Sequence, residues 1–184
     1  MKAINFGASV SLAEFANIIA TVGQNVTIIG QGEPEIGKPA MLKRIGEQLP
    51  DYETAYIDCT SLDLEDLGDF ALPYTVEEGG YGVKVTKFAP NVRFKAHTEM
   101  PVLIMLDKID KAIKSVKNVL LTLMLEHRIG DTYLPEGSIV FGTTNLASDG
   151  VGDSLGAHAR NRVAFIKIRK PHAGFNPDGS GELM

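Results

Sequence analysis

The sequence predicts an α/β fold in which a mostly parallel five-stranded sheet carries helices on both faces. Short β-branched or apolar runs of strand length alternate with segments whose apolar residues recur at helical intervals. This alternation is typical of βαβ units, because two parallel strands need a long crossover connection, which is usually a helix. Polar residues also follow the apolar runs, as expected where ligands bind at the carboxyl ends of the strands. These residues are Gly30 and those after it, Asp58, Asp107 and Asn145.

Composition and charge exclude several classes of protein. The chain has 184 residues, of which 44% are hydrophobic and 22% are charged, as expected for one folded domain. Its net charge of −5 weighs against nucleic acid or a membrane surface as a general partner. The apolar runs are also far too short to span a membrane. The chain has one cysteine, Cys59, so it cannot form an internal disulfide, and a reducing cytoplasm is the location that fits best. Cys59 is expected to be a buried residue at a strand end.

The first part of the chain predicts a helix, a strand and a second helix. Ser11-Leu-Ala-Glu14 has the spacing of a capping box, and apolar residues at helical intervals then predict a helix over residues 12–22. The β-branched run at residues 26–29 predicts a buried strand, which leads into a glycine-containing loop. Apolar residues spaced over 41–49 predict the second helix.

The middle of the chain predicts a strand and an inserted hairpin. Residues 54–58 form a strand pattern, and the acidic segment 61–69 predicts a helical turn or loop. A Glu-Glu-Gly-Gly segment with β-branched residues alternating beside it predicts a hairpin insertion at about residues 76–88.

The remaining elements complete the alternation. Strands are predicted over residues 101–106, 138–143 and 164–168, and a helix over 112–128. The tail over 171–184 is rich in Gly and Pro without periodicity, which predicts a flexible C-terminal segment.

A phosphate-binding loop is predicted between the first strand and the second helix. Gly32-Glu-Pro-Glu-Ile-Gly37-Lys38 fits the pattern G-x-x-x-x-G-K in the required position between a strand and a helix. Backbone N–H groups of such a loop face an anion, and the lysine ammonium lies near the outer phosphates. The next residue, Pro39, has neither a hydroxyl for Mg²⁺ nor an N–H, and Glu33 and Glu35 add negative charge. The alternative is an ordinary glycine-rich turn.

A carboxylate follows the most apolar strand. Val102-Leu-Ile-Met-Leu106 precedes Asp107, which is the pattern of a residue that orients Mg²⁺ beside a phosphate loop. Lys108 comes next, where hydrolytic ATPases usually carry the glutamate that polarises water. Asp110 could substitute for that glutamate, although a helix N-cap is the favoured role for Asp110 and the alternative role for Asp107.

The order and spacing of these motifs resemble the AAA+ ATPase core, and most closely its MoxR-like branch, which includes short phage-type ATPases. The resemblance covers roughly residues 10–170. It implies a P-loop NTPase fold, a three-layer αβα sandwich, although the C-terminal helical lid of the family is expected to be missing here. The expected organisation is then a nucleotide-binding core over 1–170 and a tail over 171–184. The segments that carry the resemblance best are Leu106-Asp-Lys-Ile-Asp-Lys-Ala112, Leu134-Pro-Glu-Gly-Ser-Ile-Val-Phe-Gly-Thr-Thr-Asn145 and His158-Ala-Arg-Asn-Arg-Val163.

The resemblance implies that ATP and Mg²⁺ are the cofactors. Lys38 would contact the phosphates, together with the amides of a loop that includes Gly32, Ile36 and Gly37. Asp107 would orient the metal ion.

The resemblance also implies a ring. Asn145 would be the polar sensor that positions water, and Arg160 or Arg162 would be an arginine finger that reaches the neighbouring subunit's nucleotide. A homo-oligomer, commonly a hexamer, follows, and the inserted hairpin would face its pore or a partner. Proteins of this branch usually remodel other proteins, often with a partner that bears a von Willebrand A domain. The alternatives are surface charges for the arginines and a strand-ending turn for Asn145.

Three residues depart from the family pattern, and all three fall at the catalytic site. Glu35 stands where the family commonly has Gly, Pro39 where it has Ser or Thr, and Lys108 where it has Glu. The pattern of strands and helices is intact, so we expect a folded ATP-binding module with impaired hydrolysis. The alternative function is a non-catalytic AAA+-like scaffold that interacts with other proteins.

Overall fold

Five parallel strands form the central sheet of the computed structural model, which describes residues 9–33, 37–68, 70–78, 81–89, 92–145 and 162–170. The strand order is β2-β5-β8-β1-β9, and every described pairing within this sheet is parallel. The expected α/β fold is therefore confirmed. The strands are β1 (Thr27–Gly32), β2 (Glu53–Asp58), β5 (Val102–Asp107), β8 (Ile139–Asn145) and β9 (Val163–Ile168).

The register brings the carboxyl ends of the strands to one edge of the sheet. Asp58 is aligned with Asp107, and Gly32 is aligned with both Asn145 and Ile168. The polar residues that follow the strands therefore share this edge, which we call the carboxyl edge.

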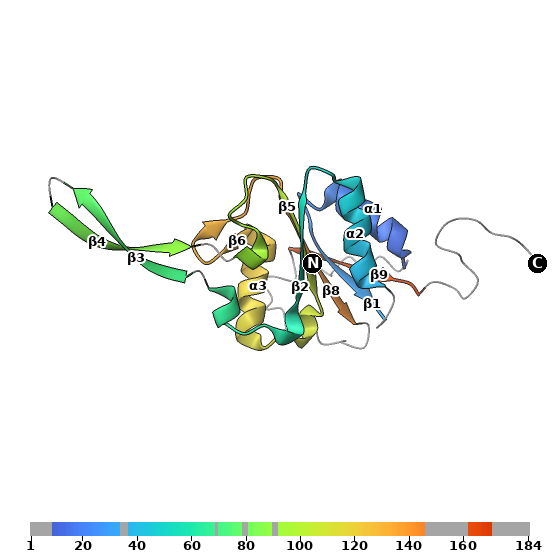
Figure 1. The fold of residues 1–184 in the computed structure, drawn as a ribbon. Coiled ribbons are helices and arrows are strands. Elements are labelled where there is room, and N and C mark those ends of the chain that lie inside the picture. The colour runs from blue at the N-terminus through green and yellow to red at the C-terminus, as the bar shows by residue number, and fades with distance from the viewer. Residues whose placement is uncertain are drawn as a thin grey trace, which may run out of the picture.

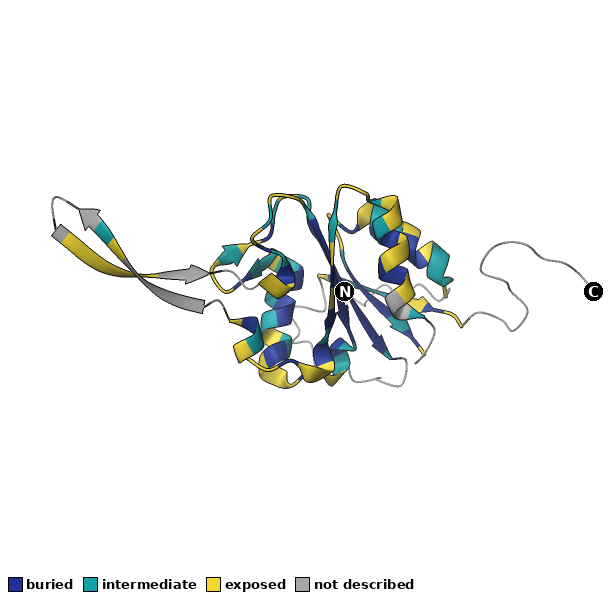
Figure 2. Ribbon diagram, in the orientation of Figure 1, coloured by how far each residue is buried: buried dark blue, intermediate teal, exposed yellow. Residues whose placement is uncertain are grey.

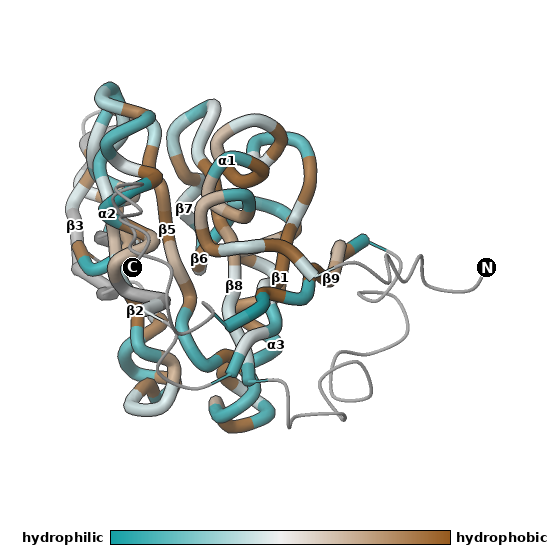
Figure 3. The backbone as a smooth tube through the Cα atoms, turned by 90° about the vertical axis from the view of Figure 1, so that its right-hand side faces the viewer, coloured by the Kyte–Doolittle hydropathy of each residue, from teal (hydrophilic) through white to brown (hydrophobic). Residues whose placement is uncertain are grey.

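Helices cover both faces of the sheet and complete three layers (Figure 1). Helices α1 (Leu12–Val22) and α2 (Lys38–Gln48) lie on one face, and α3 (Lys114–Glu126) lies on the other. Each face has its own buried apolar cluster, which follows from the two-residue period of the strands. Figure 2 shows the buried residues concentrated in the sheet and on the inner sides of the helices. Brown hydrophobic segments run through the same strands in Figure 3.

The boundaries of the elements follow their sequence patterns. Helix α1 spans the expected residues, and both hydrogen bonds of its capping box form between Ser11 and Glu14. Helix α3 begins later than predicted because residues 109–111 form a separate 3₁₀ turn, η4 (Ile109–Lys111). Asp110 lies inside that turn, so its expected N-cap role is wrong. Cys59 is fully buried in the turn η1 (Cys59–Ser61) that follows β2, as predicted.

Two antiparallel hairpins stand outside the central sheet. Strands β3 (Phe70–Glu78) and β4 (Tyr81–Ala89) form a long hairpin that projects from the body (Figure 1). Strands β6 (Arg128–Ile129) and β7 (Thr132–Tyr133) form a second hairpin of two residues each, which the sequence patterns did not predict. The turns η2 (Glu65–Leu67) and η3 (Val92–Phe94) flank the long hairpin in the chain.

Membrane-spanning helices are absent from the described part of the chain, since none of its helices combines the necessary length and apolarity. A helical lid beyond β9 is likewise absent from the described residues.

Candidate functional site

Asp107 lies at the carboxyl edge with its side chain on the α1 and α2 side of the sheet. It is the last residue of β5 and is only 3% exposed. Leu103 and Met105 lie on the same face of β5 as Asp107, because side chains two residues apart in a strand share a face. Both pack in the cluster that contains residues of α1 and α2. Asp107 is therefore directed to the face on which the predicted phosphate loop leads into α2.

Two hydroxyl groups compensate the buried Asp107 carboxylate. The Thr143 hydroxyl, on β8, donates to Oδ1, and the Tyr56 hydroxyl, on β2, donates to Oδ2 at 2.8 Å. Burial and the hydrogen bond to Asp107 raise the pKa of Tyr56, so its phenol stays protonated and acts as a neutral donor. Within the described residues no cation forms an ion pair with Asp107.

Lys108 turns away from Asp107 toward the neighbouring strand end. Its backbone adopts a left-handed conformation with φ of 55°, which is uncommon for lysine. Its ammonium lies 3.2 Å from Oδ2 of Asp58, the last residue of β2. This pairing raises the pKa of Lys108, first through the hydrogen bond and then through the charge of Asp58. The position after Asp107 thus presents a cation held by a carboxylate.

Asp58 also accepts two hydrogen bonds from Thr60. The backbone N–H and the hydroxyl of Thr60 both donate to Oδ1, at 3.0 and 2.7 Å. Although desolvation opposes it, these bonds and the Lys108 ammonium together lower the pKa of Asp58. Asp58 is therefore an ionised carboxylate whose oxygens are already engaged.

The described ends of the predicted phosphate loop have the expected backbone. Strand β1 ends at Gly32, and Gly37 adopts φ of 84°, a left-handed value that favours glycine, at the N-cap of α2. Helix α2 then begins at Lys38, which places its N-terminus at the carboxyl edge. Ile36 and the rest of 34–36 lie outside the described residues, as do the side chains of Lys38 and Pro39.

A second ion pair flanks this loop. The Lys170 ammonium, just beyond β9, lies 3.3 Å from Oε2 of Glu33. Part of the negative charge that the sequence brings into the loop is therefore balanced within the chain.

The other predicted site residues occupy different places. Asn145 is half-buried at the carboxyl edge, aligned with Gly32. Arg162 is exposed and directly precedes Val163, which is aligned with Thr27 at the opposite edge of the sheet. The structure therefore does not bring Arg162 to its own chain's carboxyl edge. Arg160 lies outside the described residues.

The carboxyl edge fits a nucleotide with Mg²⁺ better than a metal ion held by protein alone. Within the described residues no group of three or more His, Cys, Asp or Glu side chains is placed to hold a metal ion. Mg²⁺ usually binds through one or two carboxylates and completes its shell with phosphates and water. Asp107, a single buried carboxylate at the carboxyl edge on the face of the sheet that α2 covers, meets that requirement.

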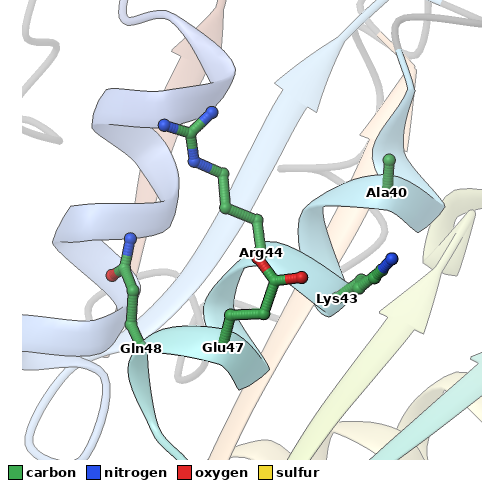
Figure 4. A pocket seen from close by; sticks show the side chains of 5 residues that line it. All are labelled: Ala40, Lys43, Arg44, Glu47 and Gln48. Carbon is green, nitrogen blue, oxygen red and sulfur yellow. The ribbon is translucent and has the colours of Figure 1, made fainter. Parts of the chain in front are cut away.

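A separate shallow pocket of about 460 Å³ lies on the outer face of α2 (Figure 4). Arg44 extends toward α1 in this view, and Gln48 donates a hydrogen bond to the Asn17 side chain at 3.0 Å. The pocket contains none of the predicted site residues. Its lining residues are Ala40, Lys43, Arg44, Glu47 and Gln48.

Sequence reasoning missed the partners of Asp107 and Lys108. Tyr56 and Thr143 were not identified as the hydrogen-bond donors to Asp107, and Asp58 was not identified as the partner of Lys108. A usable signal existed, because a residue two positions before the end of a strand has its side chain on the same face as the last residue. Tyr56 stands in this relation to Asp58.

Comparison with solved structures agrees with the fold described above. The chain is similar to Hsp104 in a closed state with ATPγS and FITC casein, at a TM-score of 0.56 and 19% identity over 85% of this chain and 32% of that one. It is also similar to a P216G mutant of RuvB from Thermotoga maritima, at a TM-score of 0.53 and 14% identity over 86% of this chain and 44% of that one. A candidate ATPase from Cytophaga hutchinsonii matches at a TM-score of 0.51 and 18% identity over 89% of this chain and 48% of that one.

These likenesses concern the fold. The chain spans between about a third and a half of the length of these neighbours. No protein-family model and no curated protein matches the sequence. The neighbours are AAA+ ATPases, and the chain therefore has the fold of an AAA+ ATPase core.

Proposed function

We propose that this protein is a MoxR-like, phage-type AAA+ module of the cytoplasm that binds ATP with Mg²⁺ and hydrolyses it negligibly. The observation that carries the proposal is the pair of residues at the end of β5. Asp107 is a buried carboxylate on the α2 side of the sheet, whereas Lys108 is a cation held 3.2 Å from Asp58. The first residue suits a metal-bound nucleotide, and the second cannot act as a carboxylate base.

The nucleotide phosphates would lie at the N-terminus of α2. Lys38 begins this helix, and the left-handed Gly37 before it allows the chain to turn from the loop into the helix. The partial positive charge of the helix N-terminus favours an anion there. Pro39 contributes no N–H, so the loop amides and the Lys38 ammonium would provide the remaining contacts.

The magnesium ion would be held through Asp107 and the nucleotide. When bound, Mg²⁺ neutralises phosphate charge. Thr143 fixes the Asp107 carboxylate from the central strand β8, so its orientation is set before any ligand arrives. Asn145 follows on the same strand and is the residue we assign to orient a water molecule.

Ring assembly would supply the arginine finger. Arg162 precedes β9 at the edge of the sheet opposite to Asp107, so it is remote from its own chain's site and suits a role in a neighbour's site. Arg160 is the other candidate for this role. The β3–β4 hairpin projects from the body and would contact a protein client or a von Willebrand A-type partner.

Impaired hydrolysis follows from the charge beside Asp107. A water molecule that attacks phosphate needs a group that accepts its proton, and a protonated lysine provides none. Asp58, the nearest carboxylate at the adjacent strand end, already accepts bonds from Thr60 and Lys108.

A non-catalytic scaffold is the second candidate function. The missing N–H of Pro39 and the negative charge of Glu35 favour it, because both weaken phosphate binding. The double variant Pro39→Ser with Lys108→Glu distinguishes a core that has lost only its catalytic groups from a core that cannot hydrolyse ATP. If hydrolysis appears, the core has lost only its catalytic groups. If none appears, the isolated core was not competent.

Equilibrium binding of a fluorescent ATP analogue tests the proposed function. Wild type and Lys43→Ala, a matched change at an exposed lysine of the same helix, should bind, and Lys38→Ala should bind at least about tenfold more weakly. Phosphate release should stay at background for all three. Equal binding by Lys38→Ala would contradict the proposed site, and absence of binding by folded wild type would favour the scaffold.

A further inference from the structure

We propose that the Tyr56 hydroxyl occupies the place at Asp107 that a divalent cation would take, and that Tyr56 thereby sets the protein's affinity for the metal ion. This inference rests on the proposed function, since that function makes Asp107 the residue that holds Mg²⁺. It assigns to Tyr56 a positioning role that the sequence motifs do not indicate.

The strand register directs Tyr56 to the Asp107 carboxylate. Tyr56 is aligned with Met105 on the adjacent strand, so it stands two residues before the carboxyl edge and on the same face as Asp107. A tyrosine is long enough to cover this offset along the strand. Its hydroxyl lies 2.8 Å from Oδ2 of Asp107.

The two donors to Asp107 differ in how easily they can leave. Thr143 is fully buried on β8, in the interior of the sheet, and has no solvent to receive its hydroxyl. Tyr56 is 43% exposed on β2, the edge strand, so its hydroxyl can exchange the carboxylate for water. Oδ2 is therefore the oxygen that can be released to a ligand, while Oδ1 stays fixed.

The charge balance at Asp107 favours a cation over the phenol. Both described donors are neutral hydroxyls, and the nearby ammonium of Lys108 is paired with Asp58. Neither donor therefore brings a positive charge to the buried carboxylate. In the proposed arrangement the Tyr56 hydroxyl and a divalent cation compete for Oδ2, so this hydrogen bond lowers the observed metal affinity.

Titration of Mn²⁺ followed by electron paramagnetic resonance tests the proposal on the full chain. The variants are Tyr56→Phe and Tyr56→Leu, which both lack the hydroxyl. Tyr52→Phe is the matched control, because the Tyr52 hydroxyl donates to the Gly137 carbonyl at 2.9 Å, just before β2 and far from its carboxyl end. Each titration is made with and without saturating ATP.

Both Tyr56 variants should bind Mn²⁺ about tenfold more tightly than wild type, which is the effect of removing one competing hydrogen bond to a charged group. Tyr52→Phe should bind like wild type. Unchanged or weaker Mn²⁺ binding in the Tyr56 variants would overturn the proposal, since the hydroxyl would then be irrelevant to the ion or would support its binding.

Binding of ATP in the presence of EDTA separates this inference from the proposed function. That measurement does not involve the metal ion, and it should give the same affinity for wild type and all three variants. Absence of ATP binding by folded wild type, both in EDTA and with Mg²⁺ present, would refute the proposed function. A tighter Mn²⁺ complex in the Tyr56 variants, measured without ATP, would still support the role of Tyr56.

Discussion

The interior of strand β5 and the residues just beyond its carboxyl end differ in what their sequence must satisfy. Val102–Asp107 is buried at every position, and its apolar residues contribute to clusters on both faces of the sheet. Lys108 follows directly, with a left-handed backbone and an ion pair to Asp58. The fold depends on many apolar contacts spread over the sheet, whereas the chemistry depends on a few groups at its edge. A substitution at the edge, such as one at Lys108, can therefore change the groups presented there without altering the fold.

Truncation inside β5 should have the largest effect on stability. Leu103→Ala removes a fully buried side chain from the cluster beneath α1 and α2, and we expect a loss of about 3 kcal/mol in the free energy of unfolding. Urea denaturation measures this loss. The control is Val92→Ala, at a residue 70% exposed, which should change stability by no more than about 0.5 kcal/mol. Similar losses in the two variants would show that the sheet interior does not dominate stability.

Removal of the Thr143 hydroxyl should have the next largest effect. Thr143→Val keeps the side-chain shape but leaves Oδ1 of Asp107 without its donor, which should cost about 1.5–3 kcal/mol. Thr122→Val is the matched control, because its hydroxyl donates to the Asn118 carbonyl within α3 and lies near the surface. Thermal unfolding of both variants measures this cost. Equal unfolding temperatures for Thr143→Val and Thr122→Val would contradict the account.

Substitution of the glycine before α2 should have a smaller effect on stability and a clear one on binding. Gly37→Ala forces a side chain into φ of 84°, which costs about 1–2 kcal/mol, and it distorts the entry to the predicted phosphate loop. Gly68→Ala, at φ of −76°, introduces the same methyl group without this strain. ATP affinity should fall for Gly37→Ala alone, and equal affinity in the two variants would remove Gly37 from the site.

The Asp58–Lys108 pair should have the smallest effect, and the effect should depend on pH. The pKa of Asp58 is lowered in the folded chain, so its stabilising contribution is present above the ordinary aspartate pKa of about 4 and is lost as the pH falls through the lowered value. Because both side chains are partly exposed, the contribution is small. Urea denaturation of wild type and Asp58→Asn should show a difference at pH 6 that shrinks below pH 4. A difference independent of pH would exclude an electrostatic origin.

Much of the fold could be predicted from local patterns. The capping box at Ser11 fixes the start of α1, and the apolar run before Asp107 identifies the fully buried strand β5. The strands of β6 and β7 are only two residues long, which is too short for any periodicity to show.

The contacts within the site could not be predicted in the same way. The bond from Tyr56 to Asp107 exists because β2 lies next to β5 in the sheet, and the order of strands along the chain does not reveal which strands are neighbours. The pairing of Lys108 with Asp58 also depends on a left-handed backbone that lysine rarely adopts. Residue types at the edge were therefore predictable, and their partners were not.

Calorimetric titration of ATP and Mg²⁺ into the wild-type protein tests the central claim most directly, because one experiment detects both binding and turnover. We predict saturable heats of binding that return to the baseline after each injection and that are lost in Lys38→Ala. A steady heat flow after each injection that is abolished by Lys38→Ala would show robust hydrolysis and contradict the account.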